Sequence, residues 1–186
     1  MLQYPPPFKY PQPMVAFFGP MASGKTYAAA NLFPQYAKYS LAAPLKKTAL
    51  EYFDVTGKSN NERQILQELA DDIKKWDNDV FTKRLLWNIW QDFKYEMVVD
   101  PIVCDDLRFT HEARDLRDYG FILVRVDVPE DLRLARIAEK YPDTDPSRFQ
   151  HKSEKDWKNI KYDYMISGNG EEGLNSLREA ISNRVQ

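Results

Sequence analysis

The sequence predicts an α/β fold of three layers, in which helices cover both faces of a five-stranded, mostly parallel sheet. Short apolar stretches recur along the chain, and the segments between them carry apolar residues at helical spacing. Strands that alternate with helices favour parallel pairing, because parallel neighbours require long crossover connections. The sequence shows no internal repeat and no boundary of a second domain.

The elements follow in a regular order. Strands are expected over residues 14–18, 38–42, 98–104, 121–128 and 162–166, and helices over residues 25–33 and from Glu130. The other helices are expected to bury four sets of residues: Leu45, Thr48, Ala49, Tyr52 and Phe53; Ile65, Leu66, Leu69 and Ile73; Phe81, Leu85, Leu86, Ile89, Trp90 and Phe93; and Leu174, Leu177 and Ile181. Ligands of such sheets bind beyond the carboxyl ends of the strands, so residues that follow strands are the functional candidates.

Composition narrows the classes of protein. Of 186 residues, 43% are hydrophobic and 29% charged, which favours a globular domain over a disordered or fibrous chain. The 26 Lys and Arg residues nearly balance 28 Asp and Glu residues, which argues against a nucleic-acid polymer as main partner. A single cysteine, Cys104, and two histidines are too few for a zinc site. No segment has the roughly 20 apolar residues of a membrane helix, so we expect a cytoplasmic protein without a membrane partner.

The first 13 residues form a proline-rich leader, and the single domain is expected over residues 14–186. Proline fixes φ and removes backbone donors, so the leader is expected to be extended and to lie outside any helix. Two interpretations remain open: its tyrosines pack on the domain, or it recruits a partner with an aromatic-lined groove.

The strongest motif is GPMASGKT at residues 19–26, which matches GxxxxGK[ST] between a predicted strand and a predicted helix. In such a loop, backbone N–H groups and the helix N-terminus bind phosphate oxygens. We therefore expect a P-loop NTPase fold that binds ATP and Mg²⁺. Lys25 is the expected catalytic contact to the β- and γ-phosphates, and Thr26 is an expected Mg²⁺ ligand. The remaining loop residues expected to bind ATP are Gly19, Met21, Ala22, Ser23 and Gly24.

A second group of candidates follows the predicted strand that ends at Cys104. Of the pair Asp105 and Asp106, one carboxylate is expected to support Mg²⁺, and we assign Asp106; a solvated loop or helix-capping role is the alternative. Arg108 is expected to be a catalytic residue that binds a phosphate of the acceptor, because a guanidinium binds phosphate at two points. The alternative for Arg108 is an ion pair with Asp105 or Glu112.

A small kinase is the favoured class. A guanine-reading NKxD motif is absent from the sequence, and the chain is short for a motor protein. A kinase needs cations around two anionic substrates and an element that excludes water. Transfer would then be direct and in line, without a covalent enzyme intermediate.

The chain resembles the deoxynucleoside monophosphate kinases of bacteriophages, within the P-loop nucleoside monophosphate kinase fold. The resemblance is carried by AFFGPMASGKT (16–26), KYSLAAPLKKTAL (38–50), RQILQELADD (63–72), IVCDDLRFTHEA (102–113), HKSE (151–154) and SGNGEEGL (167–174). It implies ATP with Mg²⁺ as phosphoryl donor and a deoxynucleoside 5′-monophosphate as acceptor.

The resemblance also implies roles for individual residues. It places acceptor-binding helices at about 44–94 and a mobile lid at about 130–155, with Arg133 and Arg136 on the ATP phosphates, Arg136 in a catalytic role, and Arg148 at the end of the lid loop. It places Asn169 near the adenine. The expected substrate-binding residues are Lys46, Arg63, Asp72, Phe81, Asp106, Arg108, Glu112, His151 and Glu154. A solvated helix surface remains the alternative for Lys46, Arg63 and the lid arginines.

Three departures limit what the resemblance implies. Ala70-Asp71-Asp72 stands where the family tends to have Gly-Thr-Asp, Phe81 stands where Trp is frequent, and an insertion of longer members after Val55 is missing. The preferred base therefore does not follow. Two other functions remain open: a P-loop kinase for another small acceptor, such as dephospho-coenzyme A, and an ATP-binding switch or interaction protein without catalysis. A homodimer is also left open.

Overall fold

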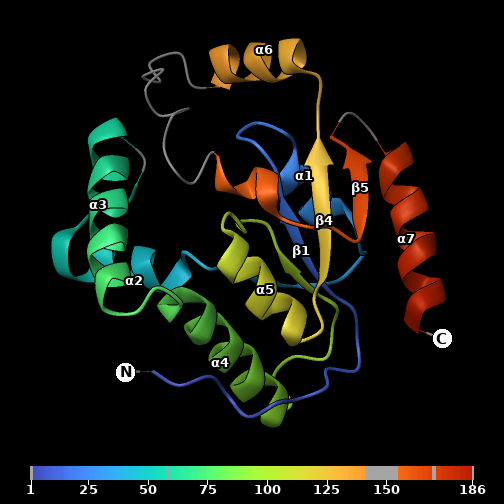
Figure 1. Cartoon of the computed structure of the whole chain (residues 1–186), viewed down its shortest axis with the longest axis horizontal. Coiled ribbons are helices and arrows are strands. Elements are labelled where there is room, and N and C mark those ends of the chain that lie inside the picture. Colours follow the sequence, from blue (N-terminus) through green and yellow to red (C-terminus); the bar gives the residue numbers. More distant parts are fainter. Residues whose placement is uncertain (1, 58, 141–154, 169–170, 186) are drawn as a thin grey trace.

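The structure is a computed structural model, and it describes residues 2–57, 59–140, 155–168 and 171–185. Five strands form one parallel sheet in the order β2-β3-β1-β4-β5, which confirms the expected fold class (Figure 1). The strands are β1 (Met14–Phe18), β2 (Ala37–Tyr39), β3 (Ile102–Cys104), β4 (Ile122–Asp127) and β5 (Tyr164–Ser167). The helices are α1 (Lys25–Asn31), α2 (Ala43–Phe53), α3 (Asn60–Trp76), α4 (Val80–Lys94), α5 (Thr110–Asp118), α6 (Glu130–Lys140), the 3₁₀ helix η3 (Asp156–Asn159) and α7 (Glu172–Val185).

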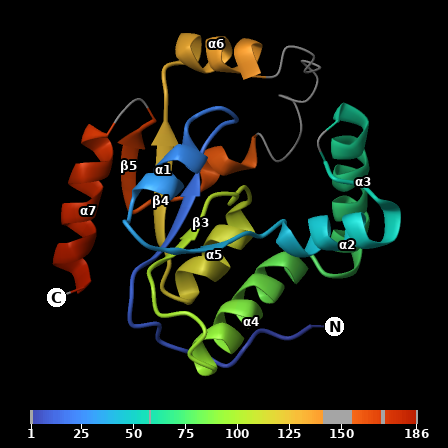
Figure 2. The same cartoon turned by 180° about the vertical axis from the view of Figure 1, so that it is seen from behind.

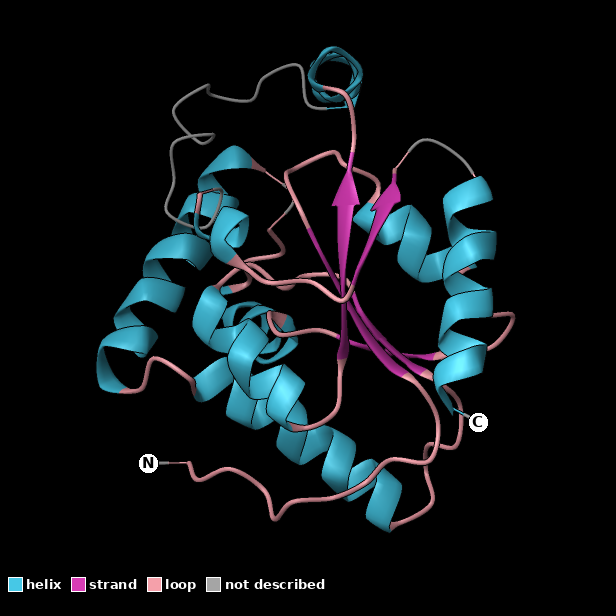
Figure 3. Cartoon of the chain, turned by 45° about the vertical axis from the view of Figure 1, so that its right-hand side comes forward, coloured by secondary structure: helices cyan, strands magenta, loops and turns pink. Residues whose placement is uncertain are grey.

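Strand β1 is the centre of the fold because all five of its residues are buried. In the parallel register, Val15 lies opposite Val103 of β3 and Ile122 of β4. Alternate residues of a strand point to opposite faces, so β1 contributes to both cores. Phe17 packs with α1 and α7, whereas Phe18 packs with α4, α5 and η3. Figure 3 shows the helices on the two sides of the sheet.

Helices α2 and α3 form a small third core beside the sheet, on the side where Figure 2 shows them together with α4. Fewer residues of these two helices are buried than the apolar spacing predicts. Tyr52 is 72% exposed and Phe53 61% exposed, and Thr48 and Ile65 are exposed as well. The buried positions of α2 are only Leu45 and Ala49, one helical turn apart. Residues 52 and 53 end α2 next to Asp54, whose φ of 54° turns the chain away.

The proline-rich leader contains no helix or strand over residues 2–13, and it runs along α4 (Figure 1). Its aromatic side chains pack on the domain. The buried Tyr10 donates a hydrogen bond to the carbonyl oxygen of Asp100 (2.7 Å), and the Tyr4 hydroxyl donates to the buried Asp115 carboxylate. The Tyr119 hydroxyl in turn donates to the carbonyl oxygen of Pro5 (2.7 Å). The leader therefore links α4, α5 and the turn before β3.

In the part of the chain that the structure describes, no helix has both the length and the apolar character needed to cross a membrane.

Candidate phosphate-binding and acceptor site

The loop between β1 and α1 has the backbone conformation that its glycines permit. Gly24 has a φ of 98° and caps the N-terminus of α1, and Gly19 has a φ of 143°. A Cβ atom at Gly19 would lie 2.4 Å from the carbonyl oxygen of Val126, so that strand β4 leaves no room for a side chain. The expected strand, glycine loop and helix are therefore all present at the centre of the sheet.

Lys25, the first residue of α1, reaches back over this loop. Its Nζ atom donates hydrogen bonds to the carbonyl oxygens of Gly19 (2.9 Å) and Pro20 (2.6 Å). A mobile ammonium at the mouth of a loop of backbone N–H groups is the arrangement that binds the terminal phosphates of a nucleotide.

The loop residues fit a phosphate group and its Mg²⁺ ion. The Ser23 hydroxyl is fully buried and has no hydrogen-bond partner among the described residues. A buried hydroxyl without a partner is rare in native structures, and a phosphate oxygen or a water molecule in the loop would satisfy it. Thr26 lies exposed in the first turn of α1, where its hydroxyl is accessible to a hydrated cation.

A cavity of about 660 Å³ opens beside the loop. This volume is typical of sites for small molecules. The cavity is lined by Ala22, Gly24, Lys25, Thr26, Tyr27, Arg136, Glu139, Lys140 and Gly168. It therefore joins the phosphate loop, helix α6 and the end of β5.

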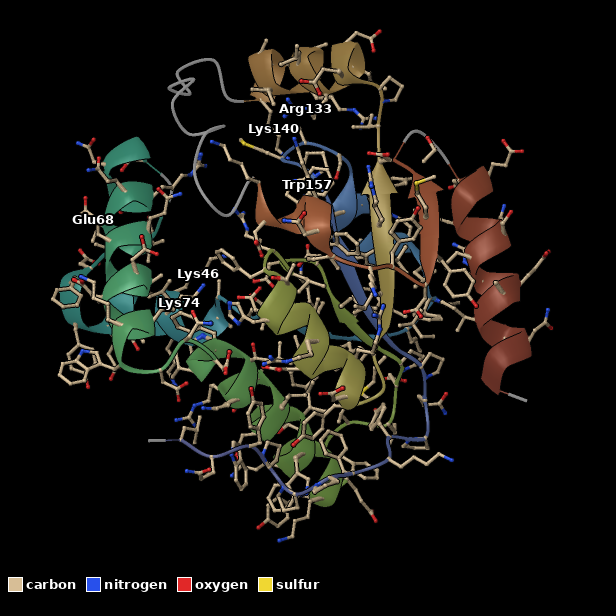
Figure 4. All side chains as sticks on the ribbon, in the orientation of Figure 1. Lys46, Glu68, Lys74, Arg133, Lys140 and Trp157 are labelled. Atoms are coloured by element: carbon tan, nitrogen blue, oxygen red, sulfur yellow. The ribbon has the colours of Figure 1, made fainter. Side chains whose placement is uncertain are left out.

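Helix α6 supplies the basic wall of this cavity. Arg136 donates hydrogen bonds to the carbonyl oxygens of Ala22 (3.4 Å) and Gly168 (3.1 Å). The side chain of Arg133 is only 13% exposed and pairs with Glu130. Figure 4 shows Arg133 and Lys140 on the side of α6 that faces the phosphate loop. Lys140, which the sequence did not single out, lies in the last turn of α6, one helical turn after Arg136.

The two carboxylates after β3 have separate partners. Asp106 accepts hydrogen bonds from the Ser40 hydroxyl (2.7 Å) and from the backbone N–H groups of Leu41 and Ala42 (both 3.0 Å). Asp105 forms an ion pair with Lys38 of β2 (2.9 Å). Asp106 therefore holds the turn that leads from β2 into α2, and its expected support of Mg²⁺ stays a prediction.

A buried charged group lies where α3, α4 and α5 meet. One carboxylate oxygen of Glu112 accepts hydrogen bonds from the backbone N–H groups of Arg108 and Phe109 (both 3.1 Å). The other oxygen lies 3.7 Å from Nζ of Lys74 in α3. Burial raises the pKa of Glu112 to about 7, against the opposing effects of Lys74 and the two N–H groups. Burial also lowers the pKa of Lys74.

Lys74 is a residue of this site that sequence reasoning missed. Its Nζ atom lies 3.8 Å from the centroid of the Phe109 ring and 5.7 Å from that of the Phe81 ring. One signal was available in the sequence: position 74 lies four residues after Ala70 and eight after Leu66, on the side of α3 that is apolar. A lysine on the apolar side of a helix needs a partner in the fold.

The other predicted acceptor residues are spread over α2, α3 and α4. Lys46 is exposed on α2. Arg63 donates from Nε to the carbonyl oxygen of Gly57 (3.1 Å), and Asp72 pairs with Lys75 on the surface of α3. The ring of Phe81 is buried in the small core with Leu45, Ala49, Val55 and Leu66. Four residues that the sequence predicts for the site lie outside the described residues: Arg148, His151, Glu154 and Asn169.

Comparison with known proteins identifies the fold. No family model and no curated protein matches the chain, whereas solved structures do. TT1252 from Thermus thermophilus has 14% sequence identity and a TM-score of 0.58, covering 96% of this chain and 100% of its own. The tunicamycin resistance protein of Deinococcus radiodurans has 14% identity and a TM-score of 0.50, covering 94% and 95%. Shikimate kinase from Aquifex aeolicus matches with 15% identity and a TM-score of 0.44, covering 92% and 97%.

At these identities the first two similarities concern the fold alone. Together with the sheet order 2-3-1-4-5 and the glycine loop after β1, they show an α/β fold with a five-stranded parallel sheet, an arrangement that is typical of P-loop kinases.

Proposed function

We propose that this chain is an ATP-dependent kinase that transfers the γ-phosphoryl group of ATP to a deoxynucleoside 5′-monophosphate, with ADP and the diphosphate as products. The observation that carries the kinase part is the cavity beside the phosphate loop. Its wall contains Lys25 from the loop side and Arg136 and Lys140 from α6. Cations on two sides of such a cavity suit the charge that spreads over a phosphoryl group during transfer.

The donor side is assigned to the loop and α6. Backbone N–H groups of residues 21–26, together with Lys25, would bind the phosphates of ATP, and Arg136 would contact them from α6. The Thr26 hydroxyl would hold Mg²⁺, with Asp106 supporting it, and this ion would supply neutralising charge to the phosphates. Arg133 is proposed to assist on the same side.

The acceptor side is assigned to the region beyond the carboxyl ends of β2 and β3. The turn held by Asp106 leads into α2, which carries Lys46, and Arg108 follows β3 after a short turn. Guanidinium and ammonium groups in this position suit an acceptor that carries a phosphate of its own. The choice of a deoxynucleoside monophosphate rests on the sequence resemblance.

The test is ADP release from ATP and Mg²⁺ in the presence of each common ribo- and deoxynucleoside monophosphate in turn. The Lys25→Ala protein serves as blank, and the diphosphate product is identified by chromatography. Acceptor-dependent ADP formation together with the matching diphosphate would support the proposal and reveal the preferred base and sugar. Equal ADP release without an acceptor, or no release with any of them, would overturn it. The same assay with dephospho-coenzyme A tests for a different small acceptor.

A further inference from the structure

We propose that Lys74 is a positioning residue of the acceptor site, which acts through Glu112 on the turn that carries Arg108. The inference rests on the proposed function, because that function assigns Arg108 to the acceptor. Lys74 comes from α3 and is far in the sequence from the other two residues, whereas Arg108 lies in the turn after β3 and Glu112 follows it closely in α5. Their connection exists only in the folded chain.

The first link runs from Glu112 to the turn. Glu112 lies in the first turn of α5, and one of its carboxylate oxygens accepts the backbone N–H groups of Arg108 and Phe109. Hydrogen bonds to an ionised carboxylate are about twice as strong as those to a neutral acceptor. The backbone at Arg108 is therefore held more firmly when Glu112 is ionised.

The second link runs from Lys74 to Glu112. Their side chains are 16% and 6% exposed, and 3.7 Å separates Nζ from the nearer carboxylate oxygen. The Phe109 ring contacts the ammonium of Lys74 from a second side. The distance from Nζ to the centroid of the ring is 3.8 Å. Because a buried carboxylate is costly without a cation beside it, Lys74 favours the ionised form of Glu112.

Titration of Glu112 therefore falls near neutral pH. Burial raises its pKa to about 7, and the charge of Asp106 raises it further, whereas Lys74 lowers it. Removal of the Lys74 charge would raise this pKa by about 1–3 units, the usual effect of an opposite charge at this distance. At pH 7 the ionised fraction of Glu112 would fall from about one half to about one tenth or less.

Other charged groups surround the pair and remain in a Lys74 variant. Asp71 of α3 and Arg108 act on Lys74. His111 of α5 forms a 2.9 Å contact with Asp79 at the start of α4, and burial, with a smaller effect of Lys74, lowers the pKa of this histidine. A shift in the pH profile must therefore be assigned to Glu112 by a variant of Glu112 itself.

The experiment compares Lys74→Met with Lys75→Met in the full chain. Lys75 is the next residue of the same helix, but it is exposed and pairs with the exposed Asp72. kcat/KM for the acceptor is measured from pH 5.5 to 9. We expect the acid limb of the profile to move to higher pH in Lys74→Met only, with a loss of about fivefold or more at pH 7. KM for ATP should stay unchanged.

Two further variants complete the test. Glu112→Gln, which cannot ionise, should lose the acid limb and show a raised acceptor KM at all pH values. Lys74→Arg should restore the wild-type profile because it keeps the charge. The ¹³C shift of the Glu112 side-chain carboxyl gives its titration midpoint independently of activity. An unmoved acid limb in Lys74→Met, or equal changes of KM for ATP and acceptor, would overturn the proposal.

Failure of the proposed function would be distinguishable from failure of this inference. If no acceptor is phosphorylated by the wild-type protein, the proposed function fails. The ¹³C titration of Glu112 in the wild type and in Lys74→Met then tests whether Lys74 acts on Glu112. An equal titration midpoint in the two proteins would overturn this inference. If Lys74→Met does not fold, Lys74→Gln, which also lacks the charge, is measured in its place, and an unmoved acid limb in that variant overturns the proposal.

Discussion

The ammonium nitrogen of Lys25 lies 2.6 Å from the carbonyl oxygen of Pro20, within the loop that immediately precedes its own helix. A second carbonyl, that of Gly19, lies 2.9 Å from the same nitrogen. The side chain therefore bends back over the loop instead of extending from α1. A phosphate that enters the loop would compete with these two carbonyl oxygens for the ammonium.

Replacement of Lys25 by alanine should remove phosphoryl transfer while the fold is retained. The loss of one group that stabilises charge in the transition state typically lowers the rate by about 10²–10³-fold. Thermal unfolding should change little, because Lys25 is only half-buried and its side chain lies over a surface loop rather than in the core. Steady-state ADP release and circular dichroism measure the two quantities. A wild-type rate in this variant would contradict the assigned chemistry.

Gly168→Ala should distort the phosphate loop. A Cβ atom at this position would lie 1.7 Å from the carbonyl oxygen of Ser23, which is a backbone atom that cannot move without the loop. We expect a loss of about 1–3 kcal/mol in unfolding free energy and weaker binding of a fluorescent ATP analogue. Gly173→Ala in α7 is the matched control, since its Cβ would approach no described atom closer than 3.3 Å. Equal behaviour of the two variants would refute the steric argument.

The two neighbouring aspartates should differ in their contribution to stability. Asp106→Asn replaces one accepting oxygen by an amide donor that faces N–H or O–H donors of residues 40–42. The expected cost is about 1–3 kcal/mol of unfolding free energy. Asp105→Asn weakens only the ion pair with the half-exposed Lys38, which is expected to cost at most about 1 kcal/mol. Urea denaturation of both variants distinguishes them, and the reverse order would show that the turn before α2 does not depend on Asp106.

Ionisation of Glu112 should affect the stability of the fold and the binding of the acceptor in opposite directions. As the pH rises, the free energy of unfolding should fall while acceptor binding improves. Its pKa rises from 4.5 to about 7 on folding, so the folded state binds more protons between these values. The stabilising contribution is complete below about pH 4.5 and is lost as the pH rises through 7. Its size is about 3 kcal/mol. The check is the difference in unfolding free energy between wild type and Glu112→Gln at pH 5 and pH 8.

Wild type should lose stability relative to Glu112→Gln as the pH rises, while its acceptor binding improves over the same range. If both quantities change in the same direction, the hydrogen bonds of Glu112 to the turn support the fold rather than position Arg108. His111 is present in both proteins, so its own titration cancels in the comparison.

The sequence by itself determined the phosphate loop and the fold class. Glycines, Lys25 and the start of α1 are neighbours in the chain, and the loop conformation depends on local backbone freedom and on the adjacent strand and helix. The alternation of strands and helices likewise predicted the parallel sheet, including all five residues of β1. The phosphate loop and the order of strands and helices can be predicted from the sequence because they depend on interactions between residues a few positions apart.

Only the tertiary structure decided which groups meet at the acceptor side. The pairing of Lys74 with Glu112 and of Asp106 with the turn after β2 joins residues that are far apart in the chain. The exposure of Tyr52 and Phe53 depends on where α2 ends against its neighbours. Periodicity shows that a helix has an apolar side, but not how much of that side another helix covers. The charge environment of Glu112 follows from that packing, since burial and the approach of α3 together set its pKa.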